Sequence, residues 1–567
     1  MSGLHGRVKE TVNVETAEVE RKQKEEKLRR YLQARNVLFE KIRNNVFDED
    51  DGEWQKVPRH VFDAEMSLTE VGLAKNPKSY SAWHHRVWMI TVAGVKDDCE
   101  TELRHCEKAL EMDDRNFHCW DYRRFICRFG QRSAAEELAF IDKKVSENFS
   151  NYSAWHSRSA LLPVVHPPLK TTEDEDGLSN GEETKNLPVD VATFEQELNF
   201  VQNAFFTDPE DQSSWFYHNW LFAVSEPRPL NLLQAVFDPA TAGICLVFDQ
   251  AISAETSIVV VSVRRDSNKE CLHLHLPWRT SDGTRSCRLL CAPLPDVSLG
   301  DLPCLQVEYR QKPSSGKDNR GQTITRKLEN WTKHRVLVWT DLTAYRNYMF
   351  SSMFASGLKR ALEEDLYGCK KLIELEPDNH WAYLTAVNAM IALDPLQFSN
   401  DIVGYLNKLV TLDPSRKKMY LHFLSRYLIK FQLVHSLSGG TPDKRLDLSD
   451  RDLHSLCDGV WFVHLTVLVV NRNRLCSLQP LKYALHLEEL YANDNRLTSL
   501  VGLEDLQKLR NVSVANNRLR KPADLRPLVN IRALHVLVVS GNVICEHYNR
   551  QDIVKFLPSS DSLIIEL

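Results

Sequence analysis

A tryptophan-centred motif recurs along the first half of the chain, and this recurrence is the strongest constraint on the fold. The four clearest copies are NPKSYSAWHHR at 76, DDRNFHCWDYR at 113, NFSNYSAWHSR at 148 and DPEDQSSWFYH at 208. Their tryptophans are Trp83, Trp120, Trp155 and Trp215, so the first two spacings are 37 and 35. Such spacings are typical of helical hairpins that stack into an array. The sequence therefore predicts a mainly α chain, a crescent of helical-hairpin repeats that forms an α-α superhelix.

Two weaker copies and one loop complete the helical part. EPDNHWAY at 376 keeps a tryptophan, whereas LDPSRKKMY at 412 has Tyr420 in its place. The third spacing, from Trp155 to Trp215, is much longer because an acidic stretch intervenes. That stretch, TTEDEDGLSNGEETKN, is too polar to build a core, so we expect a disordered loop at about 166–190. Residues 17–43 are charged with a narrow apolar stripe, which is typical of a solvated helix.

A segment of different composition interrupts the helical pattern at 236–345. ICLVFDQ, SIVVVSV, CLHLHLPW, LQVEYRQ and HRVLVWT are short, β-branched runs, and the turn sequences SDGT and SSGKD lie among them. This pattern predicts an inserted, Ig-like β-sandwich. The helical repeats are then expected to cover 1–235 and to continue over 346–440.

From residue 441 the sequence period changes to 22. LTVLVVNRNRL, LEELYANDNRL and LRNVSVANNRL share one pattern, and LHVLVVSGNVI follows at a spacing of 25. RLDLSDRDL at 445 is a starting unit with Arg451 at the asparagine position. We expect the leucines to fill one core and the asparagines to satisfy backbone groups at the turns, namely Asn473, Asn495, Asn517 and Asn542. The sequence predicts a leucine-rich repeat domain at 441–567.

Charge and cysteine content limit the possible partners. The net charge of -6 and the pI of about 6.4 give no sign of nonspecific nucleic-acid binding. No apolar run is long enough to span a membrane. The thirteen cysteines include no CxxC pair and no signal peptide is visible, so we expect reduced thiols and a cytoplasmic protein.

No complete set of catalytic residues is evident in this sequence, which contains no GxSxG, HExxH, P-loop or Rossmann motif. The adjacent pair His84–His85 is a poor zinc pair, and packing explains it well. When the motifs are aligned on their tryptophans, Lys78 and Arg115 occupy equivalent positions near helix N-termini, where basic residues are disfavoured. They form either a solvated rim or an anion site, and a phosphate fits such a site best.

An arginine follows three residues after each of the first three tryptophans. Arg86, Arg123 and Arg158 therefore lie one helical turn beyond the indole on the same face. Tryptophan fills space between stacked helices, while arginine can bond loop carbonyls or a partner. The fourth copy departs from this pattern and has His218 instead.

NPKSYSAWHHR and DDRNFHCWDYRRF resemble the repeat of prenyltransferase alpha subunits. Together with NFSNYSAWH, VQNAFFTDPEDQS, the sandwich and the leucine-rich repeats, they make nearly the whole chain similar to the alpha subunits of Rab geranylgeranyltransferases (protein geranylgeranyltransferase type II). The resemblance implies an enzyme that is active only as an alpha/beta heterodimer. The beta subunit would hold Zn2+ and the lipid pocket. The substrates implied are geranylgeranyl diphosphate and a Rab GTPase presented by Rab escort protein.

The resemblance also assigns roles to residues of this chain. Lys78 matches the family lysine that contacts the diphosphate. Tyr80, Arg115, Asn116 and His118 match the rim of the same active site. Packing or the beta-subunit interface is implied for a larger set: Trp83, His84, His85, Arg86, Trp120, Tyr122, Arg123, Trp155 and Arg158. No metal site is expected on this chain, although His5 is a possible extra ligand to the partner's zinc.

Two features depart from the family pattern, and one alternative stays open. Family members carry a further repeat before NPKSY, whereas EWQKVPRH does not look like one. His218–Asn219 replaces the usual histidine–arginine. The alternative hypothesis is a non-catalytic scaffold, in which the helical and leucine-rich arrays only bind other proteins.

Overall fold

The computed structural model of the chain describes most of its 567 residues. The described residues are 58–93, 98–168, 187–223, 230–253, 258–264, 271–281, 283–294, 305–310, 323–328, 336–350, 358–436, 444–557 and 563–567. The helix predicted at 17–43 and His5 lie outside them. The chain divides into two compact units, Met1–Ser146 with Asn151–Ala154, and Glu147–Ser150 with Trp155–Leu567.

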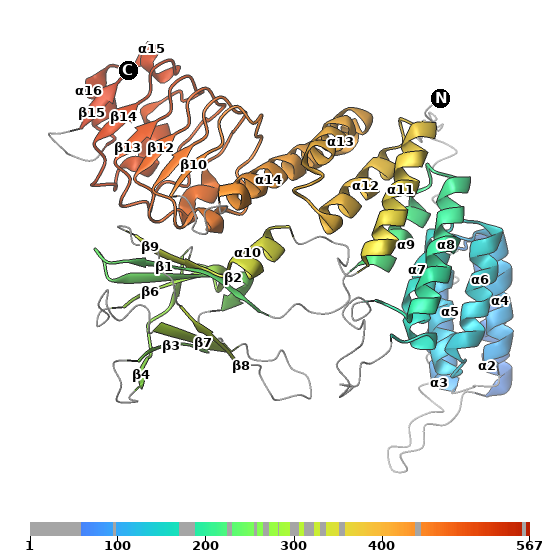
Figure 1. Cartoon of the computed structure of the whole chain (residues 1–567). Coiled ribbons are helices and arrows are strands. Elements are labelled where there is room, and N and C mark those ends of the chain that lie inside the picture. Colours follow the sequence, from blue (N-terminus) through green and yellow to red (C-terminus); the bar gives the residue numbers. More distant parts are fainter. Residues whose placement is uncertain are drawn as a thin grey trace, which may run out of the picture. The chain divides into compact units, whose positions relative to one another are not determined.

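The first unit is built from paired helices, as the motif spacing predicts (Figure 1). The helices are α2 (Arg59–Lys75), α3 (Tyr80–Ala93), α4 (Cys99–Met112), α5 (Phe117–Phe129) and α6 (Ala134–Glu147). Four-residue loops join α2 to α3 and α4 to α5, so each pair packs as a hairpin. The motif tryptophans Trp83 and Trp120 are buried between these helices.

Helical repeats continue in the second unit on both sides of a β region. The helices are α7 (Tyr152–Val165), α8 (Val191–Thr207), α9 (Gln212–Phe222), α10 (Leu342–Met349), α11 (Lys359–Leu375), α12 (His380–Leu393), α13 (Ser399–Leu412) and α14 (Lys417–His435). The loop predicted at 166–190 is too long at its C-terminal end. Leu187 and Val189 are buried because they are apolar, and Asp190 caps α8 through a bond to the Thr193 amide.

The β region consists of two antiparallel sheets, with strand orders β5-β6-β2-β1-β9 and β4-β3-β7-β8. The strands are β1 (Leu232–Asp238), β2 (Gly243–Ser253), β3 (Ile258–Arg264), β4 (Cys271–Leu274), β5 (Arg279–Thr280), β6 (Ser286–Pro293), β7 (Leu305–Arg310), β8 (Thr323–Lys327) and β9 (Leu337–Thr340). Side chains from both sheets share one hydrophobic core, which includes Phe248 and Tyr309.

The expected limits of the β insert need correction. Position 236 falls inside β1, which begins at Leu232, and position 345 falls inside α10. Strand β1 is buried along its whole length, so it lacks the alternation of polar and apolar residues that marks a half-exposed strand. For that reason the pattern missed it. The strands β5, β6 and β8 were not predicted either, although they are not buried along their whole length.

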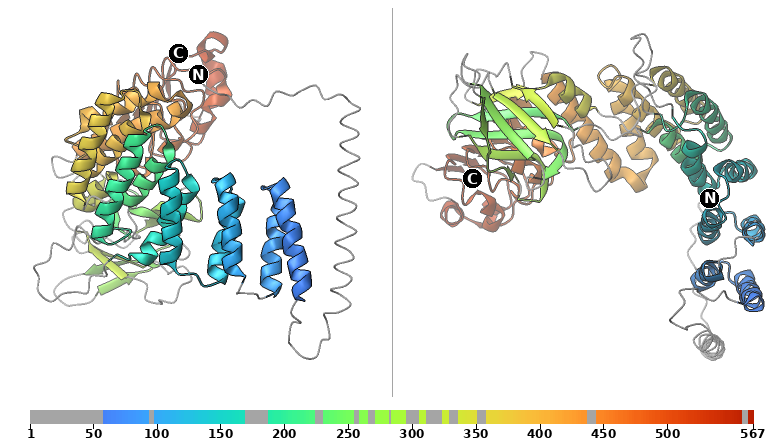
Figure 2. Two further views of the ribbon diagram at one scale, coloured as in Figure 1. Left: turned by 90° about the vertical axis from the view of Figure 1, so that its right-hand side faces the viewer. Right: turned by 90° about the horizontal axis from the view of Figure 1, so that it is seen from below.

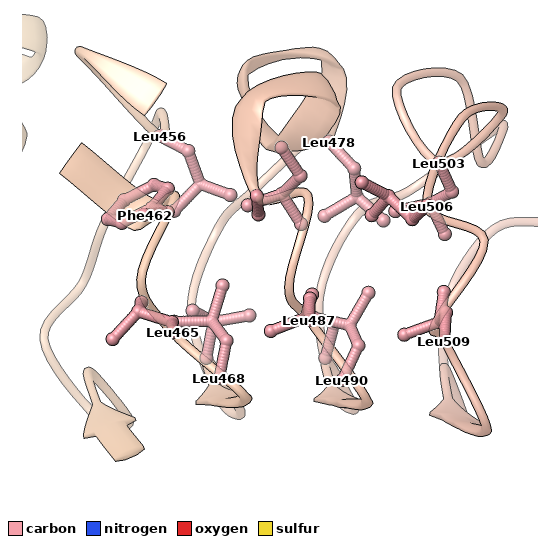
Figure 3. Close-up of a cluster of buried hydrophobic side chains, with 14 of the residues drawn as sticks. Leu456, Phe462, Leu465, Leu468, Leu478, Leu487, Leu490, Leu503, Leu506 and Leu509 are labelled. Atoms are coloured by element: carbon pink, nitrogen blue, oxygen red, sulfur yellow. The ribbon is translucent and has the colours of Figure 1, made fainter. Parts of the chain in front are cut away.

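The C-terminal segment coils around a six-stranded parallel sheet. Its strands are β10 (Arg445–Asp447), β11 (Val467–Val469), β12 (Glu489–Tyr491), β13 (Asn511–Ser513), β14 (Val536–Val538) and β15 (Ile564–Glu566). Arg445 pairs with Val467 and Val467 with Glu489, so each coil advances by one period of the leucine pattern. Figure 3 shows leucines such as Leu468 and Leu490 pointing into the shared interior.

Buried asparagines close each turn of these coils. Asn473 is 7% exposed, and its Nδ2 donates to Leu448 O at 2.9 Å and to Val470 O at 3.0 Å. Its Oδ1 accepts from Leu453 N at 2.9 Å. The same bonds recur at Asn495, Asn517 and Asn542. The role expected for these four residues, the satisfaction of turn backbone groups, is therefore confirmed.

The outer face of the five-stranded sheet shares a second core with α10, α14 and the C-terminal coils. This core contains Val247 from the sheet, Tyr345 from α10 and Trp461 from the coils. The view from below in Figure 2 shows the green strands beside the red coils. The β region and the C-terminal coils are therefore packed together within this unit.

Candidate functional site

The loops before α3 and α5 carry the predicted site residues, and tryptophan fixes their shape. Trp83 Nε1 donates to Pro77 O at 2.8 Å, and Trp120 Nε1 donates to Asp114 O at 2.8 Å. Trp155 and Trp215 make the same bond, to Phe149 O at 2.7 Å and Pro209 O at 2.9 Å. A buried indole thus pins the loop carbonyl six residues before it. We call residues 76–80 and 113–118 the rim.

Asn116 joins the two rim loops. Its Oδ1 accepts the backbone N–H groups of His118 and Cys119 and so caps α5. Its Nδ2 donates to Pro77 O at 3.0 Å, the carbonyl that Trp83 also uses. Asn116 is only 1% exposed. The structure therefore gives this residue a positioning role, beneath the loop that presents Lys78, rather than an open ligand-binding amide.

The same link recurs between other loops. Asn151 Nδ2 donates to Asp114 O at 3.1 Å, and Asn379 Nδ2 donates to Pro209 O at 2.8 Å. Each asparagine also caps its own helix through its Oδ1. The repeated asparagine is thus the joint between successive loops, a role that the sequence analysis did not assign.

Lys78 projects from the rim with a 64% exposed side chain. Its Nζ lies 3.2 Å from Asp113 Oδ2, and the Arg115 backbone N–H donates to Asp113 Oδ1 at 3.2 Å. The carboxylate of Asp113 therefore lies against both basic residues. Neither α3 nor α5 has an acidic residue in its first turn, so no carboxylate from within either helix offsets the positive end of its dipole. This arrangement suits an anionic group.

Aromatic side chains of the rim contact one another. Tyr80 is 72% exposed, and its ring meets the His118 ring edge-on at a centroid distance of 4.2 Å. His118 itself is buried and lies 4.0 Å from the Phe117 ring. Phe117 and Tyr152, at the position equivalent to Tyr80, are also half exposed. Sequence reasoning missed these two residues, although the alignment on the tryptophans places them three residues before each indole.

The repeated arginines are buried and paired with acids from a following helix. Arg86 Nε and Nη2 bond Glu102 at 2.6 and 2.8 Å, and the Tyr122 hydroxyl donates to the same carboxylate at 2.7 Å. Arg123 pairs with Glu137 and Arg158 with Glu197 in the same two-pronged way. Burial opposes the charge of Arg86, but Glu102 holds the pKa of Arg86 above its usual value. These side chains serve packing between helices.

His218, which replaces the arginine in the fourth copy of the motif, is also buried and paired with an acidic residue. His218 Nε2 lies 2.8 Å from Asp365 Oδ1, and both side chains are fully buried. In this pair Asp365 on α11 takes the place of the glutamate, and His218 takes the place of the arginine. Of the adjacent histidines, His85 contacts Glu65 at 2.8 Å and stacks on Trp88, whereas His84 is exposed.

Two searches of the described residues gave no candidates. No group of three or more His, Cys, Asp or Glu side chains among them could hold a metal ion. Within the same residues, no helix is long and apolar enough to cross a membrane.

Comparisons with known proteins point to one family. The repeat described as "Protein prenyltransferase alpha subunit repeat" matches residues 62–92, 99–129, 134–163 and 194–224. Geranylgeranyl transferase type-2 subunit alpha of Rattus norvegicus is 33% identical over 597 aligned positions, which cover 99% of this chain and 100% of the relative. The Homo sapiens protein of that name is 34% identical over 516 positions, which cover 85% of this chain and 86% of the relative.

A more distant relative and a solved structure match shorter parts. Geranylgeranyl transferase type-2 subunit alpha 2 of Arabidopsis thaliana is 32% identical over 28% of this chain and 23% of its own length. The structure titled "Candida albicans protein geranylgeranyltransferase-I complexed with GGPP" covers 28% of this chain and 47% of that chain, at 24% identity and a TM-score of 0.21.

Proposed function

Since this chain belongs to the family of geranylgeranyl transferase type-2 alpha subunits, we propose a specific role for its rim in prenyl transfer. The chain acts as the alpha subunit of a prenyltransferase, with a beta subunit as its partner. The alternative of a non-catalytic scaffold receives no support from these relatives. We propose that the substrates are geranylgeranyl diphosphate and the C-terminal cysteines of a Rab GTPase.

Lys78 is the residue that we propose for catalysis. When C1 of the lipid is attacked, negative charge grows on the departing diphosphate. The exposed ammonium of Lys78 and the N-termini of α3 and α5, which have no acidic residue in their first turns, favour that charge. A fixed donor of this kind is worth about 2–4 kcal/mol of transition-state stabilisation.

The other rim residues support this lysine. Asp113 holds the ammonium toward the neighbouring loop, and Asn116 fixes both loops from below. Arg115 adds positive charge, while Tyr80 and His118 supply the adjoining aromatic wall. Zn2+, which we propose is held by the beta subunit, would keep the acceptor cysteine as its thiolate.

The test is prenyl transfer by the co-expressed alpha/beta pair. Lys78→Ala should lower turnover about 30- to 1000-fold, because each 1.36 kcal/mol is tenfold in rate. The heterodimer should remain intact on a sizing column. Lys371→Ala is the matched control, since Lys371 is half exposed and paired with Glu374. Wild-type turnover of the Lys78→Ala pair would refute the assignment.

A groove between α8 and α11 is our proposed docking surface for Rab escort protein. It has a volume of about 440 Å³ and is lined by apolar residues such as Phe194 and Phe206 together with charged ones such as Glu364. Asp365 Oδ2 borders it and, among the described residues, has no hydrogen-bond partner, although Asp365 is 1% exposed. Phe206→Asp should weaken escort-dependent transfer while leaving the heterodimer intact.

We also propose the finer architecture. The two antiparallel sheets form an Ig-like β-sandwich at about 232–340, and 441–567 forms a leucine-rich repeat domain. The helical repeats lie on either side of this sandwich, up to α9 and again from α10 to α14, and the protein is cytoplasmic. Antiparallel sheets that share a core, and parallel coils that follow the leucine period, support these proposals. Deletion of either domain should spare much of the transfer chemistry, because the rim lies in the helical repeats.

A further inference from the structure

Two cysteines face each other across the centre of the five-stranded sheet. Cys245 on β2 is the register partner of Cys291 on β6, and the two strands run antiparallel. Their Sγ atoms lie 3.1 Å apart, and both thiols are free. In an antiparallel pair the Cα atoms of opposite residues are about 4.5–5.5 Å apart, which lies within the range that a disulfide spans.

We propose that Cys245 and Cys291 form a reversible disulfide, which makes this pair a redox modification site of the β region. The bond needs the sulfur atoms to approach by about 1 Å, to the usual S–S length near 2.05 Å. The strands already hold both residues in place on each side of the pair, through Leu246 opposite Leu290 and Ile244 opposite Ala292. Closure therefore requires side-chain movement and no change of register.

The surroundings determine which oxidant can act. Cys245 is 7% exposed and Cys291 is partly buried, on the sheet face that packs against α10, α14 and the C-terminal coils. The contact with Cys245, and then burial, raise the pKa of Cys291 well above its usual value. Few thiolates are thus present at neutral pH, and bulky disulfides have poor access. A small peroxide is the class of oxidant that fits.

The reaction balances with hydrogen peroxide as the oxidant. The thiolate of Cys291, the more accessible of the two, attacks one peroxide oxygen and breaks the O–O bond, which gives a sulfenic acid and one water. The Cys245 sulfur then attacks the sulfenic sulfur, and the S–S bond forms as a second water leaves. The two thiols lose two electrons and two protons in total. A dithiol reductant restores both thiols by exchange.

A third cysteine on the same strand provides the control. Cys287 is also buried, but its register partner on β2 is Ile252. It lies in the same core as Cys245 and has no cysteine directly opposite it. Pairing by register therefore predicts a single disulfide, Cys245–Cys291, although three cysteines lie close together.

The experiment treats the full chain, bound to its beta subunit, with hydrogen peroxide and maps the products by mass spectrometry. We expect the peptides with Cys245 and Cys291 to become linked with the loss of two hydrogen atoms, and a dithiol reductant to reverse this. Cys287→Ser should behave like the wild type, whereas Cys291→Ser and Cys291→Ala should give no linked peptide. Cys476 is exposed, so its oxidation serves as an internal control that the peroxide reacted with the protein.

Several outcomes would overturn the proposal. In the first, Cys476 is oxidised while Cys245 and Cys291 can both still be alkylated. In the second, the linked peptide contains Cys287. In the third, Cys291 gains oxygen but no disulfide forms. A thermal measurement gives a second readout, because a cross-link restricts the unfolded chain. The unfolding midpoint of the β region should rise after oxidation in the wild type and in Cys287→Ser, and should stay unchanged in Cys291→Ser.

Discussion

Replacing Glu102 with leucine tests the buried ion pairs that join successive helices. The change removes the carboxylate that faces Arg86, and both side chains are 4% exposed. It also removes the acceptor of the Tyr122 hydroxyl. Arg86 keeps its bonds to Met66 O at 2.9 Å and Thr69 Oγ1 at 2.8 Å, but neither partner carries a charge. A guanidinium is thus left buried without a counter-charge.

The cost of this change follows from that geometry. Breaking a buried ion pair by removing one partner costs about 3–5 kcal/mol, because the remaining charge is uncompensated. The orphaned Tyr122 hydroxyl adds about 1 kcal/mol. The total is about 4–6 kcal/mol. Its lower end, about 4 kcal/mol, corresponds to at least roughly a thousandfold change in the equilibrium for opening α3 and α4.

The assay is hydrogen exchange of the full chain, read on peptides from α3 and α4. Glu102→Leu should accelerate the slowest amides there about a thousandfold. Adding Arg86→Met should recover most of the loss, since both charges are then gone. Glu374→Leu breaks an exposed pair with Lys371 and should change the opening energy by less than about 0.5 kcal/mol. Equal effects of Glu102→Leu and Glu374→Leu would refute the reasoning.

Three further predictions concern the C-terminal coils. Asn473→Ala should destabilise the first coils by about 3 kcal/mol, seen as faster exchange in β10 and β11, because buried N–H and C=O groups lose their partner. Gly459→Ala should lower the unfolding midpoint, since a Cβ would lie 1.8 Å from Pro480 O, a backbone atom. Burial, and then Lys508, lower the pKa of His486 to about 4. The neutral imidazole therefore stabilises the folded state, fully above about pH 6.5 and less as the pH falls toward 4. His486→Gln should flatten the plot of unfolding free energy against pH over this range.

Local periodicity made much of the fold predictable. The tryptophan spacing located the helical hairpins, and the leucine period located the parallel strands. Both signals come from side chains that must face one core at regular intervals. Strand β1 escaped prediction because it is buried on both faces and so shows no alternation. The N-terminal limit of the β insert was misplaced for the same reason, whereas the C-terminal limit fell inside the short helix α10.

The candidate site was predicted only in part. Lys78 and Arg115 stood out because basic residues oppose a helix dipole, and Tyr80 and His118 followed from the family resemblance. The exposed aromatic residues Phe117 and Tyr152 were missed, although they occupy the position of Tyr80. Their signal was present in the alignment, but one exposed aromatic residue has no distinctive pattern by itself.

The repeating residues can be read directly from the sequence: the indoles, the arginines one turn later and the asparagines of the C-terminal coils. Their contact partners cannot, because these depend on how the elements pack. Arg86 finds Glu102 16 residues away, whereas His218 finds Asp365 147 residues away. Lys78 pairs with the carboxylate of Asp113 from the next repeat, and Cys245 lies opposite Cys291 on the neighbouring strand. A periodic pattern fixes which face of an element is buried, but the packing between elements sets which polar groups meet there.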